Sequence, residues 1–263
     1  GIAGAAMATV ISQVVVFIVF IFMLFFKNHS YISFNLSDFT FSTDIIWDII
    51  KVGLPASLSM IVMAVGQGVF NKILVHISVN TVAAYQVAGR LDMLVFLPIF
   101  SIAASLTTLV GMFYGAKEYG ALRYIIKYGI FSALLITIIS STIVYTFAGH
   151  VVRFFTDDAS IVIIAVNFLQ IFAFAYPFIS VGITTGRVLQ GLGKGLPVLI
   201  ITIVRVLGVS APLALFFVFI MDKTVEWVWY SMMLSTIVAF GIGLTWLIST
   251  LKTLPTSGQS YNN

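Results

Sequence analysis

Seven long apolar runs constrain this chain more than any other feature. They cover about residues 2–26, 49–75, 83–112, 124–147, 161–186, 196–220 and 227–251, and each is long enough for the roughly 20 residues that a helix needs to cross a bilayer. The runs do not alternate between apolar and polar residues, as the strands of a membrane barrel do. The sequence therefore predicts an all-α integral membrane protein with seven transmembrane helices.

The scarcity of charge excludes several classes of protein. Only 8% of the residues are charged and 60% are hydrophobic, whereas about a quarter of a soluble domain is charged. A soluble enzyme and a disordered chain are excluded, and a nucleic-acid partner is not expected because no basic face is clustered. The chain has no cysteine, its three histidines are far apart, and it has no ATP-binding loop. We expect no enzyme activity, no metal and no cofactor.

The basic residues predict an orientation. One side of the membrane receives Lys27, Lys51, Lys117, Arg123, Lys127, Arg187, Lys194 and Lys252, and the other receives only Lys72, Arg153 and Lys223. The side with more Lys and Arg is the cytoplasmic one. We therefore expect a multi-pass protein of the cytoplasmic or inner membrane, with the lipid bilayer as a partner and the polar C-terminal tail in the cytoplasm.

Charged residues inside the runs are candidate site residues. A charge at mid-membrane costs at least about 2.5–3.5 kcal/mol and usually faces a protein interior or a cavity. Arg90 and Asp92 are two residues apart, so their side chains point in different directions and should not pair. We expect Asp92 to be the counter-ion of Lys72 or Arg205. This carboxylate either locks helices together or takes part in a titrating or substrate-sensing step.

Uncharged polar residues form stripes along three runs. Met63, Gln67 and Asn71 share one helical face, as do Gln86 and Arg90, and such stripes either line a cavity or form hydrogen bonds between helices. A further run carries Asn167 and Gln170 among Phe168, Phe172, Phe174, Tyr176 and Phe178. These aromatic residues either line a cavity for flat, amphipathic or cationic ligands or belong to the core and the lipid surface. Kinks are expected at Pro55, Pro98, Pro177 and Pro212.

Several stretches, taken in order, resemble the MATE (multidrug and toxic compound extrusion) family of secondary transporters. Residues 1–9 with Ser12 and Gln13 resemble the family's sixth helix, and residues 52–57 resemble the start of the seventh. The eighth helix is matched by 83–86 with 90–92 and its cytoplasmic end by 108–116, and residues 190–194 match the loop between helices ten and eleven. No single match is specific, but the ordered set is.

The resemblance implies an architecture. The family has twelve helices in two six-helix lobes. Residues 1–26 would be the last helix of the N-terminal lobe, 27–48 a cytoplasmic linker between the lobes, 49–251 the six-helix C-terminal lobe and 252–263 a disordered cytoplasmic tail. Because the chain begins at Gly1 inside an apolar run and has an odd number of spans, we expect the N-terminal lobe to lie outside this sequence.

The resemblance also implies a function. The family exchanges Na⁺ or H⁺ for drugs, often cationic and amphipathic, by alternating between outward- and inward-facing states. Its NorM-like branch has acids at positions that correspond to Met63 and Ser180 here, so the chain resembles the DinF-like branch more closely. There the coupling acids lie in the N-terminal lobe, and the carbonyl of Ala5 and the hydroxyl of Thr9 match the part of the cation site on helix six. Alternatively, the Thr9 hydroxyl bonds to its own helix backbone.

Within this chain we expect eight residues to line a substrate cavity or to act in the conformational switch: Gln67, Asn71, Gln86, Arg90, Asp92, Asn167, Gln170 and Tyr176. Two alternatives to a drug exporter stay open. A lipid-linked oligosaccharide flippase of the same superfamily should show more cationic residues in its cavity. A non-transporting membrane scaffold subunit would need no polar stripe facing a cavity.

Overall fold

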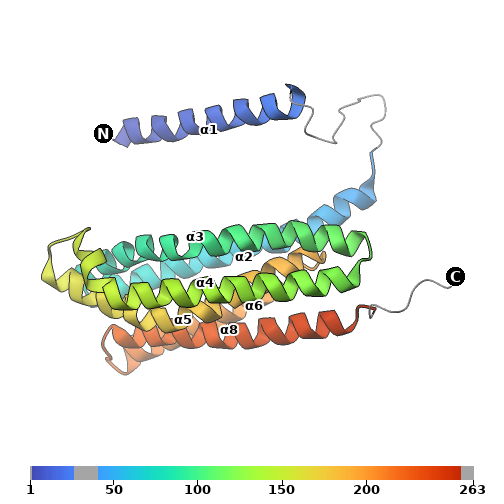
Figure 1. Cartoon of the computed structure of the whole chain (residues 1–263). Helices are drawn as coiled ribbons and strands as arrows, with labels where there is room; N and C mark the ends of the chain where they lie inside the picture. The colour runs from blue at the N-terminus through green and yellow to red at the C-terminus, as the bar shows by residue number, and fades with distance from the viewer. Residues whose placement is uncertain (1, 27–40, 256–263) are drawn as a thin grey trace. The chain divides into compact units, whose positions relative to one another are not determined.

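The computed structural model describes residues 2–26 and 41–255, which belong to two separate units, Gly1–Thr43 and Asp44–Asn263. The first unit contains α1 (Ile2–Phe26), and the second contains all the later helices (Figure 1). Among the described residues, seven helical segments are long and apolar enough to cross a membrane. The predicted all-α membrane fold is confirmed. Most of the predicted linker, 27–40, and the tail from residue 256 lie outside the described residues.

The second unit consists of long helices that run side by side (Figure 1). They are α2 (Thr43–Ile77), α3 (Val79–Gly115), α4 (Tyr119–Arg153), α5 (Ala159–Gly191) and α8 (Glu226–Lys252). The span between α5 and α8 is divided into α6 (Leu196–Ile203), the π-helix η2 (Val204–Ser210), α7 (Ala211–Leu215) and the π-helix η3 (Phe216–Ile220). Residues 43–48, predicted as the end of the linker, are instead helical. Helix α2 begins at Thr43, before its apolar stretch starts.

Short capped turns join consecutive helices at one end of the bundle. Ser78 alone separates α2 from α3, and its hydroxyl accepts the N–H of Thr81 at 3.1 Å. Asp158 caps α5 by accepting the N–H groups of Ser160 at 2.9 Å and Ile161 at 3.4 Å. The Ser160 hydroxyl and these two N–H groups lower the pKa of Asp158 below its ordinary value. Turns this short force neighbouring helices to run antiparallel.

A hydrogen bond between helices compensates for the proline within α5. Pro177 has no N–H, so the carbonyl of Ala173, four residues earlier, loses its partner in the helix. The hydroxyl of Ser141 on α4 donates to that carbonyl. The bond satisfies a buried acceptor and ties α4 to α5, next to Tyr176 on the same turn of helix.

The core of the second unit is aromatic at its centre, where Trp229, Tyr176 and Phe168 are the largest fully buried side chains. A close approach fixes one wall of this region. A Cβ added at Gly66 on α2 would lie 2.3 Å from Cγ1 of Val206 on η2, so a larger residue there would force Val206 or the backbone to shift. The absence of a side chain at Gly66 therefore lets α2 contact the π-helical segment.

Candidate functional site

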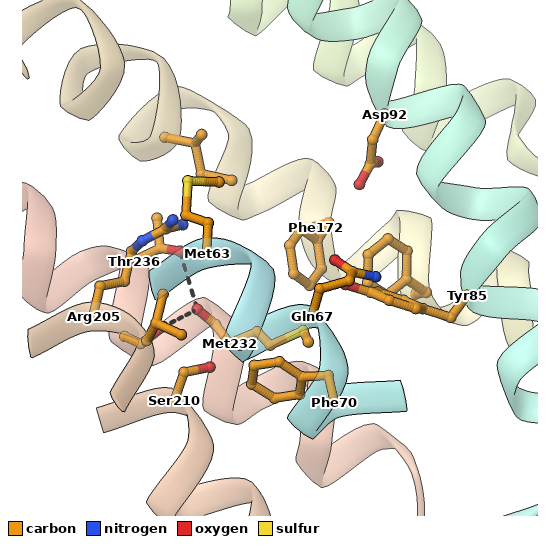
Figure 2. Close-up of a pocket in the computed structure, with 15 residues that line it drawn as sticks. Met63, Gln67, Phe70, Tyr85, Asp92, Phe172, Arg205, Ser210, Met232 and Thr236 are labelled. Carbon is orange, nitrogen blue, oxygen red and sulfur yellow. Dashed lines mark hydrogen bonds between the residues drawn. The ribbon is translucent and has the colours of Figure 1, made fainter. Parts of the chain in front are cut away.

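A cavity of about 170 Å³ lies among α2, α3, α5, η2 and α8 of the second unit (Figure 2). Its walls combine aromatic and thioether side chains with a few polar groups, among them one acid and one base. The lining residues are Met63, Gly66, Gln67, Phe70, Tyr85, Asp92, Phe168, Phe172, Ile179, Arg205, Val206, Ser210, Met232, Ser235 and Thr236.

Asp92 is the acid of this cavity, and a buried tyrosine holds it in place. The hydroxyl of Tyr176 on α5 donates to Oδ1 of Asp92 on α3. Tyr176 is fully buried and packs edge-on against Phe96, with ring centroids 5.5 Å apart. Because Oδ2 of Asp92 has no partner within residues 2–26 and 41–255, this oxygen remains able to accept a hydrogen bond from a ligand.

Arg205 is the base of this cavity, and η2 carries it nine residues into the fifth span of the second unit, Leu196–Ile220. That position is about 14 Å deep, at 1.5 Å per residue. The part of the chain that the structure describes gives its guanidinium neither a hydrogen-bond partner nor an ion-pair partner. Figure 2 shows Asp92 and Arg205 on different sides of the cavity.

The predicted ion pair between Asp92 and Lys72 or Arg205 is not formed in this structure. Asp92 is hydrogen-bonded to Tyr176 instead, and η2 holds Arg205 on another wall. Lys72 is exposed on α2 and does not line the cavity. The prediction failed because depth along a span follows from counting residues, whereas the direction of a side chain around its helix axis depends on how the helices pack.

Aromatic rings form the wall beside these charges. Tyr85 stacks on Trp229 with centroids 5.8 Å apart, and Phe168 stacks on Phe172 at 4.1 Å. The amide of Gln67 lies beside the Tyr85 ring (Figure 2). Apolar walls with a few placed polar groups are typical of small-molecule sites, and flat aromatic faces suit flat ligands.

Of the eight residues predicted for the cavity or the switch, Gln67 and Asp92 line this cavity and Tyr176 binds Asp92. The stripe on α2 divides: Met63 and Gln67 face the cavity, whereas Asn71 Oδ1 accepts a 3.5 Å hydrogen bond from the Gln86 amide. That contact links α2 to α3, as the alternative explanation of the stripe expected.

The three remaining residues do not line the cavity. Arg90 and Gln170 are exposed on the second unit. Asn167 is half-buried, and its Oδ1 atom is buried without a partner in the described part of the chain. A switch role for any of these residues stays a prediction.

The predicted cation site lies in the other unit. Ala5 and Thr9 both belong to α1 and are four residues, or about one turn, apart. The site stays a prediction. Of the two positions that correspond to acids in the NorM-like branch, Met63 lines the cavity and Ser180 is fully buried. Among the described residues, no group of three or more His, Cys, Asp or Glu side chains could hold a metal ion.

Sequence reasoning missed the uncharged residues that α8 and η2 supply to the cavity wall. Ser210, Met232, Ser235 and Thr236 line the cavity, and the adjacent pair Ser235 and Thr236 was the available signal in an apolar run. Their hydroxyls donate to the carbonyl of Met232, at 2.7 Å and 3.0 Å. Serine and threonine form such local bonds in any membrane helix, so their presence in an apolar run does not indicate whether they line a cavity.

The family model for MatE matches residues 55–216, which cover most of the cavity's lining. A curated protein of Thermotoga maritima, described as a probable multidrug resistance protein NorM, is 27% identical over 214 residues, covering 81% of this chain and 46% of that protein. The multidrug export protein MepA of Staphylococcus aureus is 29% identical over 194 residues, covering 74% of this chain and 43% of that protein.

Solved structures show the same relationship. A MATE transporter in complex with MaL6 is 30% identical, with a TM-score of 0.89 over 95% of this chain and 57% of that one. A MOP superfamily transporter from Pyrococcus furiosus is 31% identical, with a TM-score of 0.87 over 97% of this chain and 57% of that one. The chain spans about half the length of the curated relatives it matches. The resemblance to the narrower DinF-like branch stays a prediction, whereas the family match over most of the sequence confirms the wider one: this chain belongs to the MATE family.

Proposed function

We propose that this chain is the C-terminal part of a cation-coupled antiporter that exports drugs and toxic organic compounds across the cytoplasmic membrane by alternating access. The observation that carries the proposal is the cavity itself. It places a carboxylate and aromatic rings inside a bundle of membrane-spanning helices, where an organic cation can leave water. The multidrug export protein MepA and the NorM relative support this assignment through the function in their names.

The lining of the cavity supports an exporter more than the alternatives. A flippase for lipid-linked oligosaccharides would need several cationic residues to hold its phosphates, and Arg205 is the one basic residue among those that line this cavity. A scaffold subunit would not need a charged cavity, because an unpaired charge in a span is costly and brings nothing to static packing.

The coupling ion, Na⁺ or H⁺, is part of the proposal. It would bind near Ala5 and Thr9 of α1, with acids supplied by the N-terminal lobe. A cation drives export only if it binds the outward- and inward-facing states with different affinities. Oxygen ligands of this kind suit Na⁺, and acids in that lobe would instead take up H⁺.

The test is dye accumulation in cells that express the protein. Expressing cells should accumulate less of a cationic dye such as ethidium than empty-vector cells. Collapse of the Na⁺ gradient or of the proton gradient should abolish the difference. Asp92→Asn should reduce export at an unchanged amount of protein in the membrane, and Asp157→Asn, at an exposed acid outside the spans, serves as the matched control. Equal accumulation with and without the protein, under every gradient, contradicts the exporter assignment.

A further inference from the structure

The guanidinium of Arg205 is the starting point. It lies well inside a span, lines the cavity and has no partner within the described residues. An ionisable residue inside a span is by default a functional-site hypothesis, because such residues mark the pathways of substrates and ions. Arginine presents a planar fork of N–H donors, which matches the two oxygens of a carboxylate, phosphate or sulfonate group. A ligand that binds on this side of the cavity is therefore expected to carry an anionic group.

On the Asp92 side of the same cavity, the carboxylate favours a cationic group of the ligand. Tyr176 occupies Oδ1 and leaves Oδ2 without a partner in the described residues. Tyr85, Asp92 and Arg205 all line this one cavity, so the two charges act on one shared space. A ligand ammonium group at Asp92 and an anionic group at Arg205 would satisfy both.

The lining beside the two charges suits an apolar body. Phe168, Phe172 and Tyr85 provide aromatic faces, and Met63 and Met232 provide adaptable thioether surface. The hydroxyls of Ser235 and Thr236 do not compete with Arg205 for the ligand's anionic group, because both donate to the backbone of their own helix.

We propose that this cavity recognises zwitterionic amphiphiles, compounds that carry an anionic group for Arg205 and a cationic group for Asp92 on a flat apolar body. The inference rests on the proposed export function and narrows its substrate class from cations in general to zwitterions. Arg205 is the specificity-determining residue, because it discriminates a zwitterion from a cation of the same shape.

The test compares two probes that differ by one charge. Tetramethylrhodamine carries a free carboxylate and is a zwitterion, and its methyl ester is a cation with the same ring system. Binding of each to the purified protein in lipid nanodiscs is measured by fluorescence anisotropy. The wild-type protein should bind the zwitterion about tenfold or more tightly than the ester, as one hydrogen-bonded charge contact predicts.

Three variants and one control variant show which residue produces the preference. Arg205→Gln should abolish it without weakening the binding of the ester, because the ester has no anionic group for Arg205 to hold, whereas Asp92→Asn should weaken binding of both probes, which share the cation. Arg187→Gln is the control, because Arg187 is exposed at the end of α5 and bonds to Gln190. In Arg205→Lys the preference should fall by about threefold or more, since lysine lacks the planar fork.

Each outcome of these binding measurements either supports or overturns the inference that the cavity prefers zwitterions. Equal wild-type affinities for the two probes overturn the inference, as does an undiminished preference in Arg205→Gln. If that variant binds neither probe, Arg205→Lys decides: a reduced preference with ester binding retained supports the inference, and an undiminished preference or loss of both probes overturns it. Export of the ester from cells without any zwitterion preference contradicts this inference alone, whereas zwitterion binding without export of either probe contradicts the proposed function alone.

Discussion

The hydrogen bond between Tyr176 and Asp92 makes a sharp prediction about how the cavity holds its carboxylate. The Tyr176 hydroxyl is the partner that the described residues give to Asp92, and its ring is buried against Phe96. Tyr176→Phe therefore removes one hydroxyl and keeps the packing of the ring. Asp92→Leu removes the acceptor and keeps a side chain of similar size, so the two substitutions together isolate the bond.

The expected magnitude follows from where the bond lies. Hydrogen bonds between membrane helices average about 0.6 kcal/mol and reach about 1.7 kcal/mol. A hydrogen bond to a charged group contributes about 1.5–3 kcal/mol. Asp92 is half-buried and Tyr176 is fully buried, so water competes weakly for either group. We expect a coupling free energy of about 1.5–3 kcal/mol, above the average for membrane helices.

The assay is a double-mutant cycle on the free energy of unfolding, measured by reversible denaturation in lipid-containing micelles. It requires the wild type, Tyr176→Phe, Asp92→Leu and the double variant. Tyr230→Phe is the control, because Tyr230 is exposed on α8 and its loss of a hydroxyl should change little. A coupling below about 0.5 kcal/mol would refute the reasoning, since it would place the interaction under the average for membrane helices.

Two further predictions concern the packing of the second unit. Gly66→Ala should destabilise the fold by about 1–3 kcal/mol in the same unfolding assay, because the new Cβ would lie 2.3 Å from Val206 Cγ1. Gly68→Ala is the control: a Cβ there would have nothing within 4 Å, so this variant should be neutral or stabilising. Arg123→Met should speed amide exchange over residues 248–254 by about tenfold or more, since Arg123 Nη2 donates to the carbonyls of Leu251 at 3.1 Å and Leu254 at 2.9 Å at the end of α8. Lys127→Met, one turn along α4 at an exposed site, should leave that exchange unchanged.

The fold was predictable because the bilayer imposes it. A span must be apolar, helical and about 20 residues long, so counting apolar residues located all seven spans. Counting could not locate the helix ends that extend beyond the apolar part, such as the start of α2 at Thr43. It also could not reveal the π-helical turns, because the same residues form α- or π-helix according to what packs against them.

The site was predictable in part for a related reason. Polar groups are rare in spans, so Gln67, Asp92 and Arg205 stood out, and all three line the cavity. The partners of these groups could not be predicted. Tyr176 was suspected only as one aromatic residue among several, and its role depends on where α5 crosses α3.

Arg205 shows why the direction of a side chain was the missing information. It lies in η2, where the backbone departs from the regular α-helical register, so the face it would occupy in an α-helix is not a guide to its position. Val206, the next residue, packs against Gly66 of α2. The same close approach lies where η2 passes α2, and Arg205, the residue before Val206, lines the cavity on a different side from Asp92. An approach between two uncharged residues is therefore part of the packing beside Arg205, and the spacing of charged residues along the sequence does not reveal it.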